Sequence, residues 1–377
     1  MNSLQRMKAA IDGKPFDQYP YLSTYPAWSM LPYMPELTGG LSWVHAHWGT
    51  DEERIRCAAA LTEGLGIDWM LPPTQKHEPG RFEIEMDGDV PILVDKIENT
   101  RTRKEEFPSD DAVTEPKFTS ARQVEALPAV ATAETLVDCD FEITREMANR
   151  YGQDNFLVLT FVGPFAHCYY NLGFDGLMQA IASDPALMSA LLERHTESLV
   201  QRAKAAAQVG VHAVRFFEIF CSADMIAEAD YLKYAFPYEQ RVVRAIRDAG
   251  LTSIMEMMGW AEPRLPHIAR LGVDVFYADA TLKGQRNDIA EFRNILGEEV
   301  CILGNIHAYD VIERGDEATW RRAIEEQARG VGKQRRYGLC NGTPTAWATP
   351  PKRLRRFGDF ARRTLAEITP PQNPPAM

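Results

Sequence analysis

The amino-acid sequence predicts an α/β protein of the (β/α)8 TIM-barrel class. From about residue 155 onward, short runs rich in β-branched and aromatic residues alternate with amphipathic helical stretches, which is typical of parallel βα units. Strands are expected at 156–162, 212–219, 252–258, 274–278, 300–305 and 336–341. The segments PYLSTYPAW and GIDWMLPP supply two earlier strands, and 377 residues suit eight units. A doubly wound sheet is the alternative, but no GxGxxG follows the first strand.

One barrel domain is expected over residues 1–368. Residues 76–122 interrupt the βα rhythm with alternating polar and apolar positions and turn residues, so we expect a β-hairpin insertion lying over one barrel face. The Pro-rich residues 369–377 are expected to form a flexible tail.

Composition narrows the class of protein. With 45% hydrophobic and 25% charged residues, the chain has no apolar run near the roughly 18 residues of a membrane span, and its start lacks the apolar stretch of a signal peptide. A net charge of -12 argues against a nucleic-acid partner. The six cysteines form no CxxC pair and indicate reduced thiols, so we expect a cytoplasmic protein.

Polar side chains follow the expected strands at the points where each strand ends. Glu218, Glu256, Asp279, His307 and Cys340 lie at five such ends. Because catalytic groups of a barrel gather at the carboxyl ends of its strands, these side chains are expected to converge. We take Glu218, Glu256 and His307 as candidate catalytic residues. Glu256, His307 and Cys340 together offer the oxygen, nitrogen and sulfur ligands that zinc accepts.

Aromatic residues and methionines crowd the segment between the first expected strand and the first long helix. Tyr25, Trp28 and Met30 belong to this segment and suggest an apolar wall that accepts an aromatic ligand. His167, Met258 and Asp279 follow other strands and complete the candidate substrate-binding set. For each aromatic residue, ordinary core packing is the alternative.

Several segments resemble the uroporphyrinogen decarboxylase superfamily over nearly the whole chain. The matching stretches are VGPFAHCYYNLGFDGLMQAIASDPALMSALLERHTESLV, YLKYAFPYEQRVVRAIRDAG, LGVDVFYAD, ILGNIHAYDVIERGDEATW and GLCNGTPTAWATPPKRLRRF. The resemblance implies a (β/α)8 barrel whose site lies at the carboxyl ends of the strands. It also implies one of two chemistries, decarboxylation or corrinoid-linked methyl transfer.

The first chemistry is disfavoured by the N-terminal residues. Decarboxylases of the family hold their acidic substrate with arginines in this region, whereas no arginine lies between Arg6 and Arg54 here. Thiol-methylating members of the second group carry His-x-Cys-Gly at one strand end and a Cys at the last. This chain has Glu256-Met257-Met258-Gly259 at the first position and keeps Cys340.

This departure resembles the O-demethylase branch most closely. A harder ligand set with Glu256 would polarise a leaving ether oxygen, so the resemblance implies a zinc-dependent transfer of a methyl group from a small methylated substrate, such as a methoxylated aromatic, to a corrinoid protein. The corrinoid belongs to a partner, since no segment resembles the cobalamin-binding Asp-x-His-x-x-Gly. The oligomeric state, including a homodimer, stays open.

Other interpretations remain for the same residues. Glu256 could form an ion pair with an arginine of a neighbouring strand, and Glu218 could join that network. His307 could tie a loop by hydrogen bonds, and Cys340 could be a small buried hydrophobe. The alternative functions are a metal-free decarboxylase or lyase with Glu256 and His307 as acid and base, and a non-catalytic ligand-binding barrel.

Overall fold

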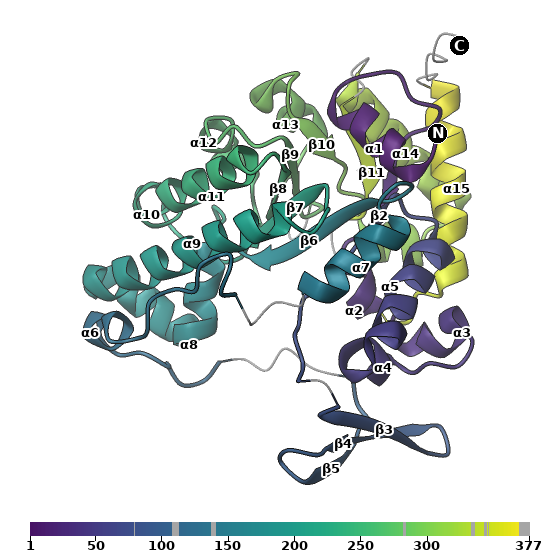
Figure 1. Ribbon diagram of the computed structural model, residues 1–377. Helices are drawn as coiled ribbons and strands as arrows, with labels where there is room; N and C mark the ends of the chain where they lie inside the picture. The colour runs from purple at the N-terminus through teal and green to yellow at the C-terminus, as the bar shows by residue number, and fades with distance from the viewer. Residues whose placement is uncertain are drawn as a thin grey trace.

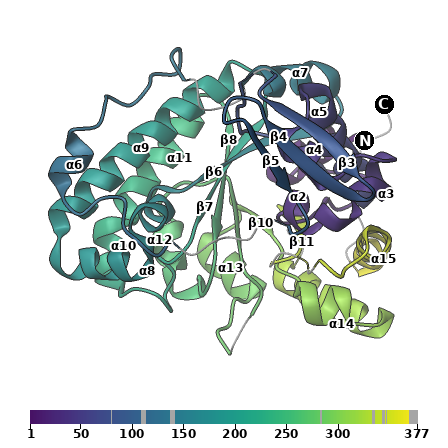
Figure 2. The same cartoon turned by 90° about the horizontal axis from the view of Figure 1, so that it is seen from below.

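Eight parallel strands form the wall of a barrel in the centre of the molecule (Figures 1 and 2). A computed structural model describes residues 1–78, 80–107, 113–136, 141–281, 284–332, 336–342, 345 and 347–368. The strands neighbour one another in the order β1 (Tyr21–Leu22), β11 (Tyr337–Cys340), β10 (Cys301–Leu303), β9 (Val275–Ala278), β8 (Thr252–Met257), β7 (Ala213–Glu218), β6 (Phe156–Val162) and β2 (Trp69–Met70). The (β/α)8 prediction is therefore confirmed, with each expected strand present.

The strands form where the sequence is apolar on both faces. All four residues of β9 and all four of β11 are buried, as are most residues of β6, β7 and β8. Parallel strands covered on both faces by helices and barrel interior read as continuous apolar runs. A charged residue inside such a strand must therefore find a partner in the interior.

The helices surround the strands in both views (Figures 1 and 2). The α-helices are α1 (Ser3–Ile11), α2 (Pro26–Ser29), α3 (Met34–Thr38), α4 (Trp43–Trp48), α5 (Asp51–Leu65), α6 (Ala121–Glu125), α7 (Phe141–Tyr151), α8 (Pro164–Ser183), α9 (Pro185–Ala207), α10 (Glu228–Tyr234), α11 (Phe236–Asp248), α12 (Leu265–Ile268), α13 (Ile289–Leu296), α14 (Glu317–Val331) and α15 (Pro351–Ile368). Short 3-10 turns occur at η1 (Leu31–Tyr33) and η2 (Glu262–Arg264), and η3 (Ala308–Glu313) is a π-helix.

The long helices bury one apolar stripe each. In α15, Leu354, Phe357, Ala361 and Leu365 are buried, and their spacing of three or four residues places them on one face. The helix begins at Pro351, the second residue of a proline pair, and contacts both α14 and α5. In this way the end of the barrel sequence packs against its beginning, as the yellow and purple helices of Figure 1 show.

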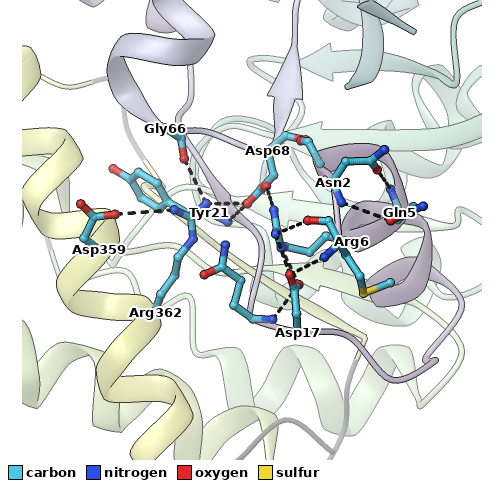
Figure 3. A network of polar contacts seen from close by, with 12 residues as sticks. Asn2, Gln5, Arg6, Asp17, Tyr21, Gly66, Asp68, Asp359 and Arg362 are labelled. Atoms are coloured by element: carbon cyan, nitrogen blue, oxygen red, sulfur yellow. Dashed lines mark hydrogen bonds and ion pairs between the residues drawn. The ribbon is translucent and has the colours of Figure 1, made fainter. Parts of the chain in front are cut away.

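A buried carboxylate joins the two shortest strands, β1 and β2. The backbone N–H of Asp68 donates to the carbonyl of Tyr21 at 2.8 Å, and its Oδ2 accepts from the N–H of Tyr21 at 2.8 Å. The same carboxylate accepts from Arg6 of α1 and from Arg362 of α15 (Figure 3). Because β1 and β2 have only two residues each, Asp68 holds the barrel together at this seam.

The predicted insertion is a small antiparallel sheet of three strands. It consists of β3 (Phe82–Asp87), β4 (Val90–Asp95) and β5 (Thr100–Arg103), so the expected hairpin carries one more strand. The sheet contacts α4 and projects from the barrel at the bottom of Figure 1. Residues 79 and 108–112 of the predicted insertion, and the predicted tail, 369–377, lie outside the described residues.

No helix among the described residues is long and apolar enough to cross a bilayer. The described cysteines, Cys57, Cys168, Cys221, Cys301 and Cys340, are all buried and free, and Cys139 lies outside the described residues. These thiols agree with the expected absence of disulfides among the described residues.

Candidate active site

Glu256, in the middle of the apolar β8, forms an ion pair with Arg215 of the neighbouring β7. Nη2 and Nε of Arg215 donate to Oε2 of Glu256 at 2.5 and 3.2 Å, and each residue is 1% exposed. The strand register pairs Arg215 with Ile254 and Phe217 with Glu256, so the two charges lie on one face of adjacent strands. The carboxylate is thus in this strand because a guanidinium lies beside it.

Aromatic rings surround the guanidinium inside the barrel. Cζ of Arg215 lies 4.7 Å from the ring centroid of Tyr25, 5.6 Å from that of Tyr277 and 5.8 Å from that of Trp69. These rings come from β9, from β2 and from the segment after β1. A buried cation over aromatic faces gains electrostatic stabilisation in addition to its ion pair.

Tyr25 completes the cluster from the segment after β1. Its backbone is left-handed, with a φ of 49°. This conformation is uncommon for residues other than glycine and often occurs at functional sites. Its hydroxyl donates to Oε2 of Glu256 at 3.0 Å. Burial, followed by the nearby Glu256, raises the pKa of Tyr25 well above its usual value. Tyr25 therefore keeps its proton and its hydrogen bond at neutral pH.

A cavity of about 340 Å³ opens beside this cluster. Most of its wall is apolar, and Tyr25 and Trp28 lie in it with residues of α5 and of the segment after β2. The charged side chains in its wall are Arg54 and Arg215, and no Asp or Glu lines it among the described residues. Its size suits a small organic ligand.

A second cavity of about 290 Å³ lies at the ends of β7, β8 and β9 and includes Met258 and Asp279. Oδ2 of Asp279 accepts the N–H of Gly259 at 2.8 Å. Burial raises the pKa of Asp279 to about 7. The hydrogen bond from Gly259 lowers this pKa, and the nearby Glu256 and Asp224 raise it by smaller amounts. Asp279 can thus carry a proton near neutral pH at the barrel mouth.

Gly259 is needed for this arrangement. Its φ is 92°, and a side chain there would collide with Ser222 and Asp224. The left-handed backbone directs the N–H of Gly259 at Asp279, which explains why the Glu-Met-Met-Gly segment ends in glycine.

The expected metal ligands are not gathered into one group. Glu256 is engaged by Arg215 and Tyr25. His307 caps η3, where its Nδ1 accepts the N–H of Asp310 at 3.1 Å. Among the described residues, no three His, Cys, Asp or Glu side chains lie close enough together to hold a metal ion. The part of the chain that is described therefore does not fit the zinc site expected from the sequence.

Cys340 is a buried thiol at the end of β11. Burial, then Glu256, raises its pKa to about 12, and its Sγ donates to the carbonyl of Asn341 at 3.3 Å. Cys340 thus takes the small buried position that was the alternative interpretation.

Glu218 holds the start of a helix. It is fully buried and accepts the N–H groups of Phe165 and Ala166, in the first turn of α8, at 3.2 and 2.8 Å. Burial and the neighbouring Glu239 raise the pKa of Glu218 well above its usual value. The carboxyl lines neither cavity described above, so its contacts are those of a helix cap.

The candidate substrate residues divide between the mouth and the core. Tyr25 and Trp28 line the first cavity, while Met258 and Asp279 line the second. Met30 is fully buried in the core and His167 stacks on His195 of α9 with ring centroids 4.6 Å apart, so neither lines these cavities. Burial lowers the pKa of His167 to about 4 and keeps it neutral.

Sequence reasoning missed several residues of the first cavity. Arg215, Trp69 and Thr160 belong to strands, and Arg54 to a helix. One signal was present, because an arginine within AVRFFE and a glutamate within SIMEMM are opposite charges in consecutive apolar strands. Their pairing follows once both strands are taken as neighbours.

Comparisons with known proteins agree with this fold. A solved methyltransferase from Methanosarcina mazei superposes with a TM-score of 0.70 at 17% identity, covering 96% of this chain and 99% of that one. The methylcobamide:CoM methyltransferase MtbA of Methanosarcina acetivorans is 23% identical over 242 residues, which are 63% of this chain and 67% of that protein. Such relatives support the expected resemblance to the corrinoid-linked branch.

Decarboxylases match as well. The uroporphyrinogen decarboxylase of Gloeobacter violaceus is 30% identical over 157 residues, 41% of this chain and 43% of that protein. The first decarboxylase relatives are matched over about half of their own length. The family model of uroporphyrinogen decarboxylase (URO-D) matches residues 106–364, and the chain therefore belongs to the uroporphyrinogen decarboxylase family.

Proposed function

We propose that this protein is a methyltransferase that removes the methyl group of a small methoxylated aromatic compound and passes it to the corrinoid of a partner protein. One observation carries the proposal: the barrel mouth has an apolar, aromatic-lined cavity, and Asp279, whose pKa burial raises to about 7, lines a second cavity at the ends of β7, β8 and β9. The similarity to methylcobamide:CoM methyltransferases supports the transfer of a methyl group.

The chemical difficulty in this reaction is the departure of the ether oxygen. A reduced corrinoid on the partner would supply the nucleophile for the methyl carbon. As the carbon–oxygen bond breaks, the oxygen gains negative charge and needs a proton. Asp279 is the group assigned to that task, because its raised pKa keeps a proton available near neutral pH.

The other residues of the mouth position the substrate. Tyr25 and Trp28 form an aromatic wall, and the ring centroid of Trp28 lies 6.0 Å from that of Trp347. The ion pair of Arg215 and Glu256 holds the hydroxyl of Tyr25 in one orientation. No step of this proposal runs through zinc, because Glu256, His307 and Cys340 are engaged in separate contacts.

Turnover tests the proposal directly. The purified chain should demethylate a methoxyarene only when a reduced corrinoid protein is also present. Asp279→Asn should lower the rate about 100-fold or more, since a positioned acid contributes about that much. Glu83→Gln, on the exposed β3 of the insertion, serves as the matched carboxyl-to-amide control and should leave the rate unchanged. An Asp279→Asn variant with wild-type rate would contradict the assigned role.

Decarboxylation of a small acid is the second candidate, and one observation favours it. The sequence lacks arginine between Arg6 and Arg54, yet the cavity wall contains Arg54 itself and Arg215. A carboxylate could be held there. Release of labelled carbon dioxide from a carboxyl-labelled aromatic acid, with its methyl group retained, would favour this candidate over methyl transfer.

A further inference from the structure

A buried amide side chain joins the ends of two neighbouring barrel strands. Asn287 lies between β9 and α13 and is 4% exposed. Its Nδ2 donates to the carbonyl of Gly259, after β8, at 2.8 Å and to the carbonyl of Asp279, after β9, at 3.0 Å. Its Oδ1 accepts the N–H groups of Ala261 and Glu262 at 3.0 and 3.2 Å. Both donors and both lone pairs of the amide are therefore used on backbone atoms.

Gly259 needs contacts of this kind, because a glycine backbone is conformationally free. Its φ is 92°, and its N–H donates to Oδ2 of Asp279 at 2.8 Å. The peptide that follows Gly259 is held at both polar atoms, since Asn287 binds its carbonyl and Asp224 accepts the N–H of Trp260 at 2.9 Å. The direction of the Gly259 N–H thus depends on side chains from outside its own strand.

Other side chains hold Asn287 in turn. Nδ2 of Asn305, after β10, donates to the backbone carbonyl of Asn287 at 2.7 Å and to that of Asp279 at 3.1 Å. Oδ1 of Asn305 accepts from Gln327 of α14 at 2.9 Å. Gln327 accepts the hydroxyl of Tyr337, in β11, at 3.1 Å. A connected network of this kind keeps its members in one arrangement, so the position of Asn287 is fixed by the barrel.

We propose that Asn287 is a positioning residue for Asp279: its amide fixes Gly259 so that the N–H of Gly259 stays on the Asp279 carboxyl. The inference rests on the proposed function, in which Asp279 is the acid of methyl transfer. A backbone N–H favours the ionised form of a carboxyl. Without Asn287, Gly259 would lose its fixed direction, and the acid would lose both this contact and its exact place.

The ionisable groups that face Asp279 lie on other elements. Burial raises the pKa of Asp279 most, and Glu256 of β8 and Asp224 after β7 raise it by smaller amounts. The phenol of Tyr25 is a further neighbour, from the segment after β1. The side chain of Asn287 is uncharged, and its hydrogen bonds go to backbone atoms. Replacing it with alanine therefore leaves these charges as they are.

The amide of Gly259 reports the contact directly. Met258-Gly259 is the only Met-Gly pair in the sequence, so the full chain labelled with carbonyl carbon-13 methionine and nitrogen-15 glycine shows this one N–H by NMR. In the wild type, its proton shift should move with a midpoint near pH 7 as Asp279 titrates. Asp279→Asn should abolish the movement. An amide of Gly259 that does not respond in the wild type would overturn the inference.

Asn287→Ala removes the amide without adding charge. It should reduce the pH-dependent movement of the Gly259 proton by about half or more, because a hydrogen bond weakens steeply once its geometry is lost. The kcat of methyl transfer should fall about tenfold with little change in KM, as expected for a misplaced acid. Asn287→Ser, which is also uncharged, provides the same test if the alanine variant does not fold.

Asn155→Ala is the matched control. Asn155 directly precedes β6, at the opposite end of the strands from Asp279, and donates to the carbonyl of Tyr151. This variant should leave the Gly259 movement and the rate unchanged. A folded Asn287 variant whose Gly259 amide titrates as in the wild type would overturn the inference.

The two proposals fail in different ways. If the Gly259 amide responds as expected but no methyl group reaches a reduced corrinoid protein, the proposed function fails and the positioning of Asp279 by Asn287 stands. If methyl transfer occurs and Asn287→Ala changes neither the Gly259 movement nor kcat, the proposed function stands and the positioning inference fails.

Discussion

At the scale of single residues, the main finding is the partner of Glu256. A carboxylate in an apolar strand suggests either a metal ligand or an ion pair, and its contacts with Arg215 and Tyr25 favour the ion pair. A buried charge pair adds little net stability over apolar residues, but removing one member leaves the other charge unpaired. Removing one member of the pair should therefore lower the free energy of unfolding more than removing both members.

Arg215→Met should lower the free energy of unfolding by about 3–5 kcal/mol, because Glu256 would be left as a buried unpaired carboxylate. The double variant Arg215→Met with Glu256→Met should recover most of that loss. Denaturant unfolding of both variants measures the difference. Arg101→Met, which breaks an exposed pair with Glu85 on the insertion sheet, is the control and should cost less than about 1 kcal/mol. Equal losses in the single and double variants would show that the pair is not the cause.

The protonation of Asp279 predicts a pH profile. A general acid works only while it holds its proton, so the rate of methyl transfer should fall as the pH rises through about 7, the pKa to which burial raises Asp279. The rate measured from pH 5.5 to 8.5 checks this, and the fall should be absent from the residual activity of Asp279→Asn. A rate that rises with pH across this range would assign Asp279 the role of a base.

At the scale of elements, the strands were predictable and their contacts only partly so. Apolar runs and their spacing predicted all eight barrel strands, and Asp279, expected at a strand end, lines the cavity at the ends of β7, β8 and β9. The ion pair of Glu256 with an arginine of a neighbouring strand was one of the alternatives, but periodicity alone does not give the strand register that identifies Arg215 as the partner. Met30 and His167 line neither cavity, because a residue near a strand end can still turn toward the core or a neighbouring helix.

The seam between β1 and β2 predicts an unusual dependence on one side chain. Asp68→Ala should lower the free energy of unfolding by about 3 kcal/mol or more, because Arg6 and Arg362 would lose their buried carboxylate. Chemical unfolding measures the loss, and amide exchange at Tyr21 should become faster. Asp12→Ala, which removes an exposed pair with Lys14, should change neither quantity. A small loss for Asp68→Ala would mean that strand packing alone closes the seam.

At the scale of the whole molecule, the barrel gathers distant segments into one mouth while the insertion sheet stands beside it (Figure 1). The family and the fold follow from the order of many weak sequence features, whereas the ligand set depends on a few contacts. This is why the barrel was predictable and the zinc site was not supported by the described side chains. The homodimer and the corrinoid partner stay predictions.

Metal analysis checks the whole-molecule conclusion. We expect the purified chain, produced with ample zinc, to contain well below one zinc ion per molecule, because Glu256 is ion-paired with Arg215 and the described residues form no cluster of three His, Cys, Asp or Glu side chains. Inductively coupled plasma mass spectrometry gives the content. A stoichiometric zinc ion that is lost in both His307→Ala and Cys340→Ser would restore the metal site expected from the sequence.

The fate of a labelled methyl group tests the central claim most directly. A single turnover would use 4-methoxybenzoate with a carbon-13 methoxy group, the purified chain and a stoichiometric amount of reduced corrinoid protein. The account predicts that mass spectrometry finds the label on the corrinoid protein and the aromatic product as the free phenol. Label retained on the aromatic compound, with an unmethylated corrinoid protein, would contradict the account.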